Sequence, residues 1–385
     1  MTLDDLAILA CASGRPFAEL MNQNLIDMVG LPRWRDSYVL PSREIWWPGD
    51  DQDQGKKGEG KTVIDTNTRG CHIVVVQDVI NYQPFEDDSI ENKNERRKKS
   101  KLVSISENDK IVALENAIDA AQRTAKQITV VIPYYPYSRQ EKRTKDKNEG
   151  LLTEGITVKR IAERIEHAGN GKVTRVMTLD VHNEAIEPLH HQAEFLNVYA
   201  SKDIIPYIHA TYGFNDVVFA AADVGGAARA KFYSNITGLP LVFSYKEKDF
   251  SGSGGVDKTI IVGEPKGKRV FVVEDMIARG GTMESGVRAF RDAGASEVYW
   301  ISSLSLLLGP AKERIEDLYK KGLLNGVIVT DSIFHGNYFD KHPDIYGCVP
   351  TSCTFAKAAL RAHLGTSVSD MFKPKRILQN LNGYK

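Results

Sequence analysis

A run of strand-forming residues ends in two adjacent acids, Glu274 and Asp275, and opens into a glycine turn at residues 280–282. Backbone N–H groups in such a turn, at the start of a helix, can bind a phosphate. Carboxylates cannot attract a phosphate by charge, but they accept hydrogen bonds from sugar hydroxyls or from the waters of a metal ion. The combination predicts a ribose 5-phosphate pocket, in which the acids bind the 2- and 3-hydroxyls and the amides of Gly280, Gly281 and Thr282 bind the phosphate.

A second glycine turn follows the apolar run at residues 216–223. Asp223 closes that run, and Gly225 and Gly226 allow a tight turn before the next predicted helix. The N–H groups at the start of this helix can hold an anion, and the neighbouring acid can hold the accompanying metal ion. The alternative is an ordinary glycine turn in which Asp223 caps the helix.

A third strand end, VVIPYYPYSRQEKR at residues 130–143, combines two prolines, three tyrosines and a cationic cluster. Rigid turns, flat apolar rings and bidentate guanidinium groups suit a nucleotide with phosphates. The alternative is a solvated basic turn. A fourth strand end, TLDVHNEAI, places His182 two residues after Asp180. His182 could lie at a magnesium ion, but magnesium prefers oxygen ligands and water. The alternative is that His182 has a structural role.

The elements that must position these strand ends are apolar β-branched runs alternating with amphipathic helical stretches. This alternation predicts an α/β fold with mainly parallel sheets covered by helices on both faces, and sites at the carboxyl ends of the strands. Strands are expected at residues 6–12, 72–78, 128–134, 173–180, 216–223, 240–246, 269–275, 297–303 and 326–332. Helices are expected near residues 16–29, 110–125, 157–167, 226–237 and 282–293.

The chain has 385 residues, which favours two domains. Lys+Arg 50 balances Asp+Glu 50, so the net charge gives no reason to expect a nucleic-acid or membrane partner. No apolar run reaches the roughly 18 residues of a membrane span. The apolar stretch LAILACA follows Asp4 and Asp5, the wrong charge for a signal peptide, so a cytoplasmic enzyme is expected.

One motif match is rejected. GKKGEGKT, Gly55 to Thr62, fits the G-x-x-x-x-G-K-[ST] pattern of a nucleotide-binding P-loop. It lacks a preceding apolar strand and a following helix, so no row of helix amides would meet a phosphate. The segment 48–61 is instead interpreted as a solvated hairpin tip, and the charge run at 84–101 as a surface loop.

Taken in order, these motifs resemble those of the ribose-phosphate diphosphokinases, the PRPP synthetases. The resemblance spans roughly Leu6 to Phe372 and rests on an ordered set: VVIPYYPYSRQEKR, TLDVHNEAI, LNVYAS, ADVGGAAR, YKEK, VVEDMIARGGT and LGTSVSDMF. It implies two phosphoribosyltransferase-like domains. The first, residues 1–202, would take ATP, with residues of about 356–385 packing back on it. The second, residues 203–355, would take ribose 5-phosphate.

The resemblance also implies transfer of the β,γ-diphosphoryl group of MgATP to the C1 hydroxyl of ribose 5-phosphate, by a homo-oligomer of dimers assembling to a hexamer. By matching position, Arg139, Gln140 and Glu44 would bind ATP. His182 and Asp223 would lie at Mg2+, and Asp223, Gly225 and Gly226 would form the diphosphate loop. Ribose 5-phosphate would be bound by Glu274, Asp275, Arg279, Gly280, Gly281 and Thr282. Lys246 and Lys248, beside the segment DFSGSGGVDK, match a mobile loop whose cations would stabilise the transition state.

The chain departs from the family pattern at both substrates. The usual ribose loop begins Asp-Asp and carries a third Asp and a Thr where this chain has Ala278 and Arg279. The usual adenine-binding segment Phe-Ser-Asp-Gly-Glu reads LPSRE here, from Leu40 to Glu44. Lys248 stands where the mobile loop usually has Arg, which keeps the charge but not the planar fork.

Three functions therefore remain in view. An active, divergent PRPP synthetase is favoured by Arg139, Gln140, Asp223 and Lys246. A catalytically weak regulatory subunit is favoured by Ala278. A type I phosphoribosyltransferase would also have the acidic pair and glycine loop, but it would not need the ATP motif.

Overall fold

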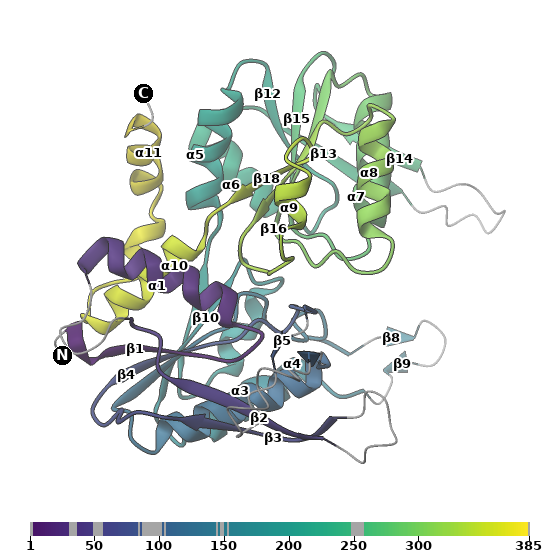
Figure 1. Ribbon diagram of the computed structural model, residues 1–385. Helices are drawn as coiled ribbons and strands as arrows, with labels where there is room; N and C mark the ends of the chain where they lie inside the picture. Colours follow the sequence, from purple (N-terminus) through teal and green to yellow (C-terminus); the bar gives the residue numbers. More distant parts are fainter. Residues whose placement is uncertain are drawn as a thin grey trace. The chain divides into compact units, whose positions relative to one another are not determined.

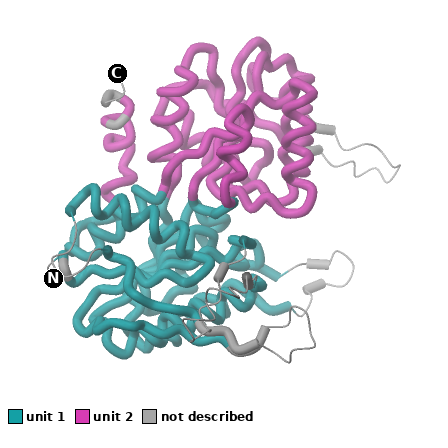
Figure 2. The backbone as a smooth tube through the Cα atoms, in the orientation of Figure 1, with its two compact units in different colours: residues 1–198, 332–335, 352–368 teal, residues 199–331, 336–351, 369–385 magenta. Residues whose placement is uncertain are grey.

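The computed structural model describes residues 3–30, 37–48, 57–83, 85–86, 102–103, 105–143, 145–146, 150–151, 154–247 and 258–383. The chain divides into two compact units, coloured separately in Figure 2. Unit 1 comprises Met1–Val198, Ser332–His335 and Ser352–Val368. Unit 2 comprises Tyr199–Asp331, Gly336–Thr351 and Ser369–Lys385.

Unit 1 is built on a parallel five-stranded sheet in the order β1-β4-β7-β10-β11. β1 and β4 are buried along their whole length, as expected for strands covered on both faces. The strands are β1 (Leu6–Ala10), β4 (His72–Val76), β7 (Gln127–Val131), β10 (Val173–Leu179) and β11 (Glu194–Val198).

The helices of unit 1 pack in two pairs, α1 with α10 and α3 with α4. The rings of Phe17 and Phe355 join the first pair edge to face at 5.3 Å. α3 begins earlier than the sequence predicted, because Ser106 and Asp109 form a capping box at its start. These helices are α1 (Arg15–Val29), α3 (Glu107–Gln122), α4 (Thr157–Gly169) and α10 (Ser352–His363).

The rejected P-loop match lies in a hairpin. β2 (Ser42–Pro48) pairs antiparallel with β3 (Lys57–Ile64), and Lys61 is the register partner of Ile45. The Lys-Thr pair therefore sits inside a strand, where no helix start can offer amides to a phosphate, and the rejection is confirmed. The expected hairpin tip falls partly on residues 49–56, and the expected loop at 84–101 mostly on residues 87–101, which lie outside the described residues.

Unit 2 is built on a seven-stranded sheet in the order β14-β13-β12-β15-β16-β17-β18. Its pairings are parallel except that of β13 with β14. From β12 the chain first proceeds outward through β13 and β14, and from β15 it proceeds the other way. The strands are β12 (Val217–Ala221), β13 (Leu241–Glu247), β14 (Lys258–Val262), β15 (Arg269–Met276), β16 (Glu297–Leu304), β17 (Gly326–Thr330) and β18 (Tyr346–Val349).

Successive residues of β15 enter different cores on the two faces of this sheet. Val270 and Val272 join the apolar cluster that includes Val287 of α7 (Gly281–Asp292) and Ile315 of α8 (Ala311–Lys320). Phe271 instead stacks on Tyr299 and meets Tyr212 of α5 (Ser201–Tyr212). Figure 1 shows α5 and α6 (Ala227–Thr237) lying away from α7 and α8. The predicted α/β fold with mainly parallel sheets is confirmed.

The remaining elements are short or lie outside the sequence prediction. α5 was not predicted, and it carries Pro206 in its interior. The other elements are η1 (Leu3–Asp5), β5 (Phe85–Glu86), β6 (Leu102–Val103), β8 (Lys145–Asp146), β9 (Gly150–Leu151), η2 (Glu184–Leu189), α9 (Tyr338–Lys341), η3 (Ser369–Phe372) and α11 (Pro374–Gly383).

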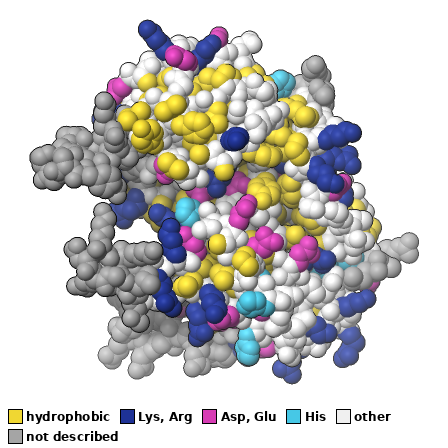
Figure 3. All heavy atoms as spheres, turned by 180° about the vertical axis from the view of Figure 1, so that it is seen from behind, with side chains coloured by type: hydrophobic (Ala, Val, Ile, Leu, Met, Phe, Trp, Pro, Cys, Tyr) yellow, Lys and Arg dark blue, Asp and Glu magenta, His cyan; other side chains and the backbone are white. Residues whose placement is uncertain are grey.

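The surface agrees with the balanced composition. On the face of the described residues drawn in Figure 3, basic and acidic side chains lie interspersed with exposed hydrophobic ones. Among the residues that the structure describes, no helix has the length and apolarity needed to cross a membrane.

Candidate active site

The first predicted loop follows β12 directly. Asp223 and Gly225 are exposed, and Gly226 is the buried N-cap residue of α6. The Asp223 carboxylate accepts a hydrogen bond from the Gly226 N–H at 2.9 Å, so this acid already braces its own turn. Asp223 therefore makes the hydrogen bond that is typical of an ordinary Asp turn. Its side chain is nevertheless exposed, so a ligand could reach it.

Gly226 is also the point where two loops meet. A Cβ placed there would lie 3.0 Å from Oε1 of Glu274 and 3.4 Å from the carbonyl oxygen of Val273. Contacts of this length are tighter than nine in ten real Cβ contacts, so glycine at this position lets the turn at Asp223 lie closely against the acidic strand end. The close approach was not visible in the spacing of the sequence.

The acidic pair at the end of β15 is buried. Glu274 is 8% exposed and Asp275 is 6% exposed. Oε1 of Glu274 has no hydrogen-bond partner in the described residues. Burial, followed by the charges of Asp223 and Asp275, raises the pKa of Glu274 to about 8. Such a carboxyl group is available to a ligand that brings hydroxyl donors or positive charge.

Asp275 is held from two sides. Oδ1 accepts a hydrogen bond from the N–H of Met276 at 2.8 Å, and Oδ2 lies 3.8 Å from a guanidinium nitrogen of Arg229 on α6. Arg229 was not among the predicted site residues, although it stands three residues after Gly226, on the first turn of a helix whose start was predicted. It supplies positive charge beside the acids.

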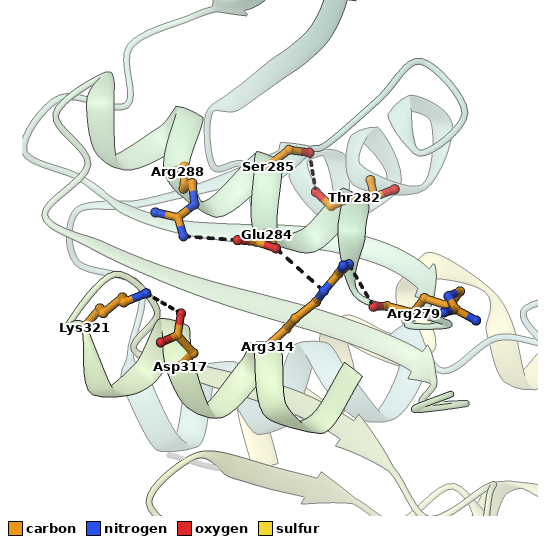
Figure 4. Close-up of polar contacts among 8 residues, drawn as sticks. All are labelled: Arg279, Thr282, Glu284, Ser285, Arg288, Arg314, Asp317 and Lys321. Atoms are coloured by element: carbon orange, nitrogen blue, oxygen red, sulfur yellow. Dashed lines mark hydrogen bonds and ion pairs between the residues drawn. The ribbon is translucent and has the colours of Figure 1, made fainter. Parts of the chain in front are cut away.

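The turn predicted to bind phosphate, here called the phosphate turn, begins at Gly280, which has φ 77° and is the N-cap residue of α7. No side chain of the described residues caps this helix. Gly281 and Thr282 are exposed, so their end of the helix can offer free amides to an anion. Figure 4 shows Thr282 at this helix start, near Arg279 and Arg314.

The loop between β16 and α8 supports the phosphate turn from behind. The N–H groups of Leu307 and Leu308 bond to the carbonyl oxygens of Ile277 and Ala278, at 3.0 and 2.7 Å. Arg314 of α8 donates to the carbonyl oxygen of Arg279 at 3.3 Å, a contact drawn in Figure 4. Sequence reasoning missed this support, because the two segments are distant in the chain.

Arg279 itself is exposed, and its guanidinium group lies against the same supporting loop. A Cβ placed on Gly309 would be 3.4 Å from the guanidinium carbon. The backbone of Ala278 is fixed by Leu308, whereas the Arg279 side chain projects from the turn. The residue that departs from the family pattern is therefore part of the turn that would meet the 5-phosphate.

These loops share one edge of the sheet. β12 and β15 are adjacent parallel strands, and the direction of strand order reverses between them. In open α/β sheets, ligands bind in the crevice beyond the carboxyl ends of the strands at such a reversal. Asp223 to Gly226 and Glu274 to Thr282 meet at this position, as the sequence predicted for strand ends.

In unit 1, the predicted nucleotide turn follows β7. Tyr137 has a positive φ of 57°, and its carbonyl accepts the N–H of Gln140 at 2.9 Å. Arg139 and Gln140 are exposed, whereas Tyr135 is 1% exposed and fixes the base of the turn. The turn thus presents its polar residues outward from a buried aromatic anchor.

The loop that carries His182 lies beside this turn. The side chain of Asn183 donates to Oε1 of Glu141 at 3.2 Å, which joins the two loops. Burial raises the pKa of Glu141, but the net direction is a lowered pKa, through hydrogen bonds from its own amide and Asn183 and the charges of Lys142 and His182. His182 is exposed at the carboxyl end of β10.

Glu44 has a contact that sequence reasoning did not anticipate. The residue is 8% exposed, and Oε1 accepts the N–H of Ala12 at 2.8 Å. It therefore ties β2 to the loop after β1, and its assignment to ATP stays a prediction. Lys246 lies in β13, but its side chain is outside the described residues, as is all of Lys248.

The acids of unit 2 offer part of the donor set that a divalent cation needs. Within the described residues, no group of three or more His, Cys, Asp or Glu side chains has the geometry of a complete metal site. The partnerless Oε1 of Glu274 and the exposed carboxylate of Asp223 are nevertheless hard oxygen donors of the kind that magnesium takes together with water and phosphate. They fit a cation that arrives with its phosphate ligand.

Known proteins with similar sequences identify the family. Residues 50–169 match the family model described as the N-terminal domain of ribose phosphate pyrophosphokinase, and residues 191–330 match that of the phosphoribosyl transferase domain. The ribose-phosphate pyrophosphokinase of Prochlorococcus marinus (strain MIT 9313) is 33% identical over 273 residues, which cover 69% of this chain and 75% of the relative. The chain belongs to the ribose-phosphate pyrophosphokinase family.

Two further relatives cover nearly the whole chain. Ribose-phosphate pyrophosphokinase 2 of Enterococcus faecalis is 29% identical over 378 residues, 96% of this chain and 97% of the relative. The crystal structure of phosphoribosylpyrophosphate synthetase from Mycobacterium smegmatis superimposes with a TM-score of 0.69 at 22% identity, covering 94% of this chain and 99% of that one. The fold expected from the resemblance is therefore confirmed.

Proposed function

We propose that this ribose-phosphate pyrophosphokinase transfers the β,γ-diphosphoryl group of ATP to the C1 hydroxyl of ribose 5-phosphate, giving PRPP and AMP. The observation that carries the proposal is the meeting of two loops at the strand-order reversal of unit 2. One loop offers turn amides and Asp223, and the other offers buried acids followed by an uncapped helix start. Amides suit the phosphates and acids suit the sugar hydroxyls.

Ribose 5-phosphate is assigned to unit 2. Asp275, with its carboxylate fixed by the Met276 N–H, and Glu274 accept hydrogen bonds from the 2- and 3-hydroxyls. The amides at Gly281 and Thr282 bind the 5-phosphate, and Arg279 supplies a guanidinium group to it. The C1 oxygen attacks the β-phosphorus, AMP leaves from the opposite side, and the hydroxyl proton is lost to solvent or base.

ATP is assigned to unit 1. Arg139 and Gln140 are the exposed polar residues of the turn after β7, and they suit a triphosphate. Glu44 belongs to the same proposal through the family pattern. The catalytic cations are Lys246 and Lys248, on a segment that would close over ATP and exclude water.

Mg2+ is the proposed metal ion. His182 and Asp223 are its expected neighbours, and Glu274 offers a further oxygen. When bound, magnesium neutralises phosphate charge and orients the phosphate oxygens. The proposal also includes a homo-oligomer of dimers assembling to a hexamer, and a cytoplasmic location.

The test is the product pattern. Protein is incubated with MgATP and ribose 5-phosphate, and AMP and PRPP are followed by chromatography and phosphorus NMR. AMP and PRPP should form in equal amounts, and Lys246→Ala should abolish both. Lys268→Ala is the matched control, because Lys268 pairs with Asp216 on an exposed turn.

Two outcomes would contradict the proposal. If the wild type forms AMP no faster than Lys246→Ala, the chain is not an active synthetase, and the catalytically weak regulatory subunit is favoured. Consumption of PRPP with a purine base, without any need for ATP, would instead indicate a phosphoribosyltransferase.

A further inference from the structure

Three buried polar side chains form a chain behind the nucleotide turn of unit 1. The Tyr135 hydroxyl lies 2.9 Å from Nε2 of His190, and Nδ1 of His190 lies 3.5 Å from Oε1 of Glu166. The three residues are 1%, 8% and 5% exposed, respectively. They come from the turn after β7, the loop after η2 and helix α4. We call Tyr135, His190 and Glu166 the relay.

We propose that the relay is a positioning device for the nucleotide turn, so that Tyr135, His190 and Glu166 set the affinity of the enzyme for ATP without touching it. The inference rests on the proposed function of Arg139 and Gln140. Tyr135 belongs to the motif at residues 130–143, but neither the motifs nor the family pattern singled out His190 or Glu166.

Glu166 is the fixed end of the relay. Its carboxylate accepts hydrogen bonds from the backbone N–H groups of His191, Gln192 and Ala193, at 3.3, 2.9 and 3.0 Å. Burial raises the pKa of Glu166, but these amides and His190 hold it below its usual value. The carboxylate therefore stays ionised while buried, and it cannot rotate without breaking its hydrogen bonds to the three backbone N–H groups.

Glu166 orients His190. Burial lowers the pKa of His190, against the opposing effect of Glu166, so the ring is neutral near pH 7. A neutral imidazole has one donor and one acceptor nitrogen. Nδ1 makes no hydrogen bond within the described residues, but the charge of the carboxylate 3.5 Å away favours the proton on that atom, which leaves Nε2 to accept from the Tyr135 hydroxyl. The ring is also stacked on Phe195, with centroids 5.2 Å apart and an interplanar angle of 24°.

Tyr135 connects the fixed ring of His190 to the nucleotide turn. Its carbonyl accepts the N–H of Ser138 at 3.3 Å, and the following left-handed residue Tyr137 directs the chain outward to Arg139. A phenyl ring could fill the same space, but it would not be tied to His190. A shift of about 1 Å in a positioned group can cost roughly 100-fold in rate, so a contact that fixes the turn can act on a ligand that it does not touch.

The decisive variant is Tyr135→Phe, which removes one hydroxyl and keeps the ring. We expect the KM for ATP to rise about tenfold, the loss expected for one buried hydrogen bond, while the KM for ribose 5-phosphate and kcat stay within about twofold. Tyr38→Phe is the matched control. Tyr38 is also 1% exposed in unit 1, and its hydroxyl donates to the carbonyl of Gly30 at 3.0 Å.

A second pair of variants tests the far end of the relay. Glu166→Gln should also raise the KM for ATP, whereas Glu163→Gln should not, because Glu163 lies on α4 in exposed ion pairs with Lys159 and Arg160. Thermal unfolding of each variant separates positioning from stability. A Tyr38→Phe protein with the same loss of stability and an unchanged KM for ATP would support the relay.

The inference fails if Tyr135→Phe leaves the KM for ATP within about twofold of Tyr38→Phe, or if all three kinetic constants change together. Calorimetric titration with ATP and magnesium keeps the test independent of the proposed reaction. If the wild type binds ATP but forms no AMP, the function is wrong, and weaker binding by Tyr135→Phe still supports the relay. If both proteins bind ATP equally, the relay is wrong.

Discussion

Two buried glutamates, one in each unit, have opposite environments. Glu166 in unit 1 is 5% exposed and accepts three backbone N–H groups, which lower its pKa against the effect of burial. Glu274 in unit 2 is 8% exposed, has an oxygen without a partner in the described residues, and has a pKa raised to about 8 by burial and neighbouring acids. Burial alone therefore does not distinguish a structural acid from one kept for a ligand.

The difference shows how the two sites are built. In unit 1 the buried charge of Glu166 is satisfied by hydrogen bonds within the protein. The polar groups proposed for ATP, Arg139 and Gln140, are exposed on the turn after β7. In unit 2 the acids themselves are the proposed binding groups, and Oε1 of Glu274 is left without a partner in the described residues, at a cost in stability. A ligand or cation that completes the pairing should stabilise unit 2 more than it stabilises unit 1.

The largest expected effect comes from moving Glu274 away from its place. Gly226→Ala puts a Cβ 3.0 Å from Oε1 of Glu274, so the carboxylate or the turn at Asp223 must shift. We expect AMP formation to fall about 100-fold with only modest loss of stability. Gly155→Ala is the control, because a Cβ there meets nothing within 4 Å. Activity within about threefold of wild type in Gly226→Ala would show that the close approach does not matter.

Removing the charge of Glu166 should give the next largest effect, on stability. Glu166→Gln leaves one acceptor oxygen and points an NH2 group toward backbone donors. We expect the free energy of unfolding at pH 7 to fall by about 2 kcal/mol, measured by urea denaturation. Because the folded pKa lies below the usual 4.5, the wild type should lose this advantage as the pH falls below that value. A variant as stable as wild type at pH 7 would break the contrast between the two acids.

Glu274 should show the opposite dependence on pH. Its folded pKa of about 8 lies above its usual 4.5, so between these values the folded state binds more protons than the unfolded state. In protein free of divalent cations, stability should fall as the pH rises through this window, by up to about 1.4 kcal/mol per pH unit from this group. The slope should be smaller in Glu274→Gln. Equal slopes in the two proteins between pH 5 and about 8 would refute the assignment.

The exposed arginines should separate the two substrates. Arg279→Ala should raise the KM for ribose 5-phosphate about tenfold and leave the KM for ATP unchanged, as one charge-assisted hydrogen bond is lost. Arg139→Ala should do the reverse. Steady-state kinetics with each substrate varied in turn measures both KM values. A variant that raises the two KM values equally would contradict the assignment of one substrate to each unit.

The smallest effect is expected at the rejected P-loop match. Lys61→Ala should change the affinity for ATP by less than about twofold, because Lys61 lies inside a strand of a hairpin. Calorimetry with wild type and variant is the measurement. A loss of ATP binding there would move the nucleotide site away from the turn at Arg139.

Much of the fold followed from periodicity. Continuous apolar runs predicted the buried strands of both sheets, because strands covered on both faces contain few polar residues. α3 was predicted with a late start, since its capping box at Ser106 was overlooked. The helices α5, α8 and α10 were missed, as were the strands β11, β14 and β18, and α5 contains Pro206 in its interior. At the site, the strand-end acids and glycine turns were predicted, whereas Arg229, Arg314 and the relay were not.

The sequence by itself determined the chemistry available at each strand end: acids, amides and cations at fixed spacings, because a strand and the turn after it are local structures. Only the tertiary structure decided how those groups are paired. Whether Glu274 lacks a partner, Glu166 has several, or Arg314 supports the turn at Arg279 depends on segments far apart in the chain. Burial and pairing, which set the pKa of each acid, are properties of packing that no local pattern contains.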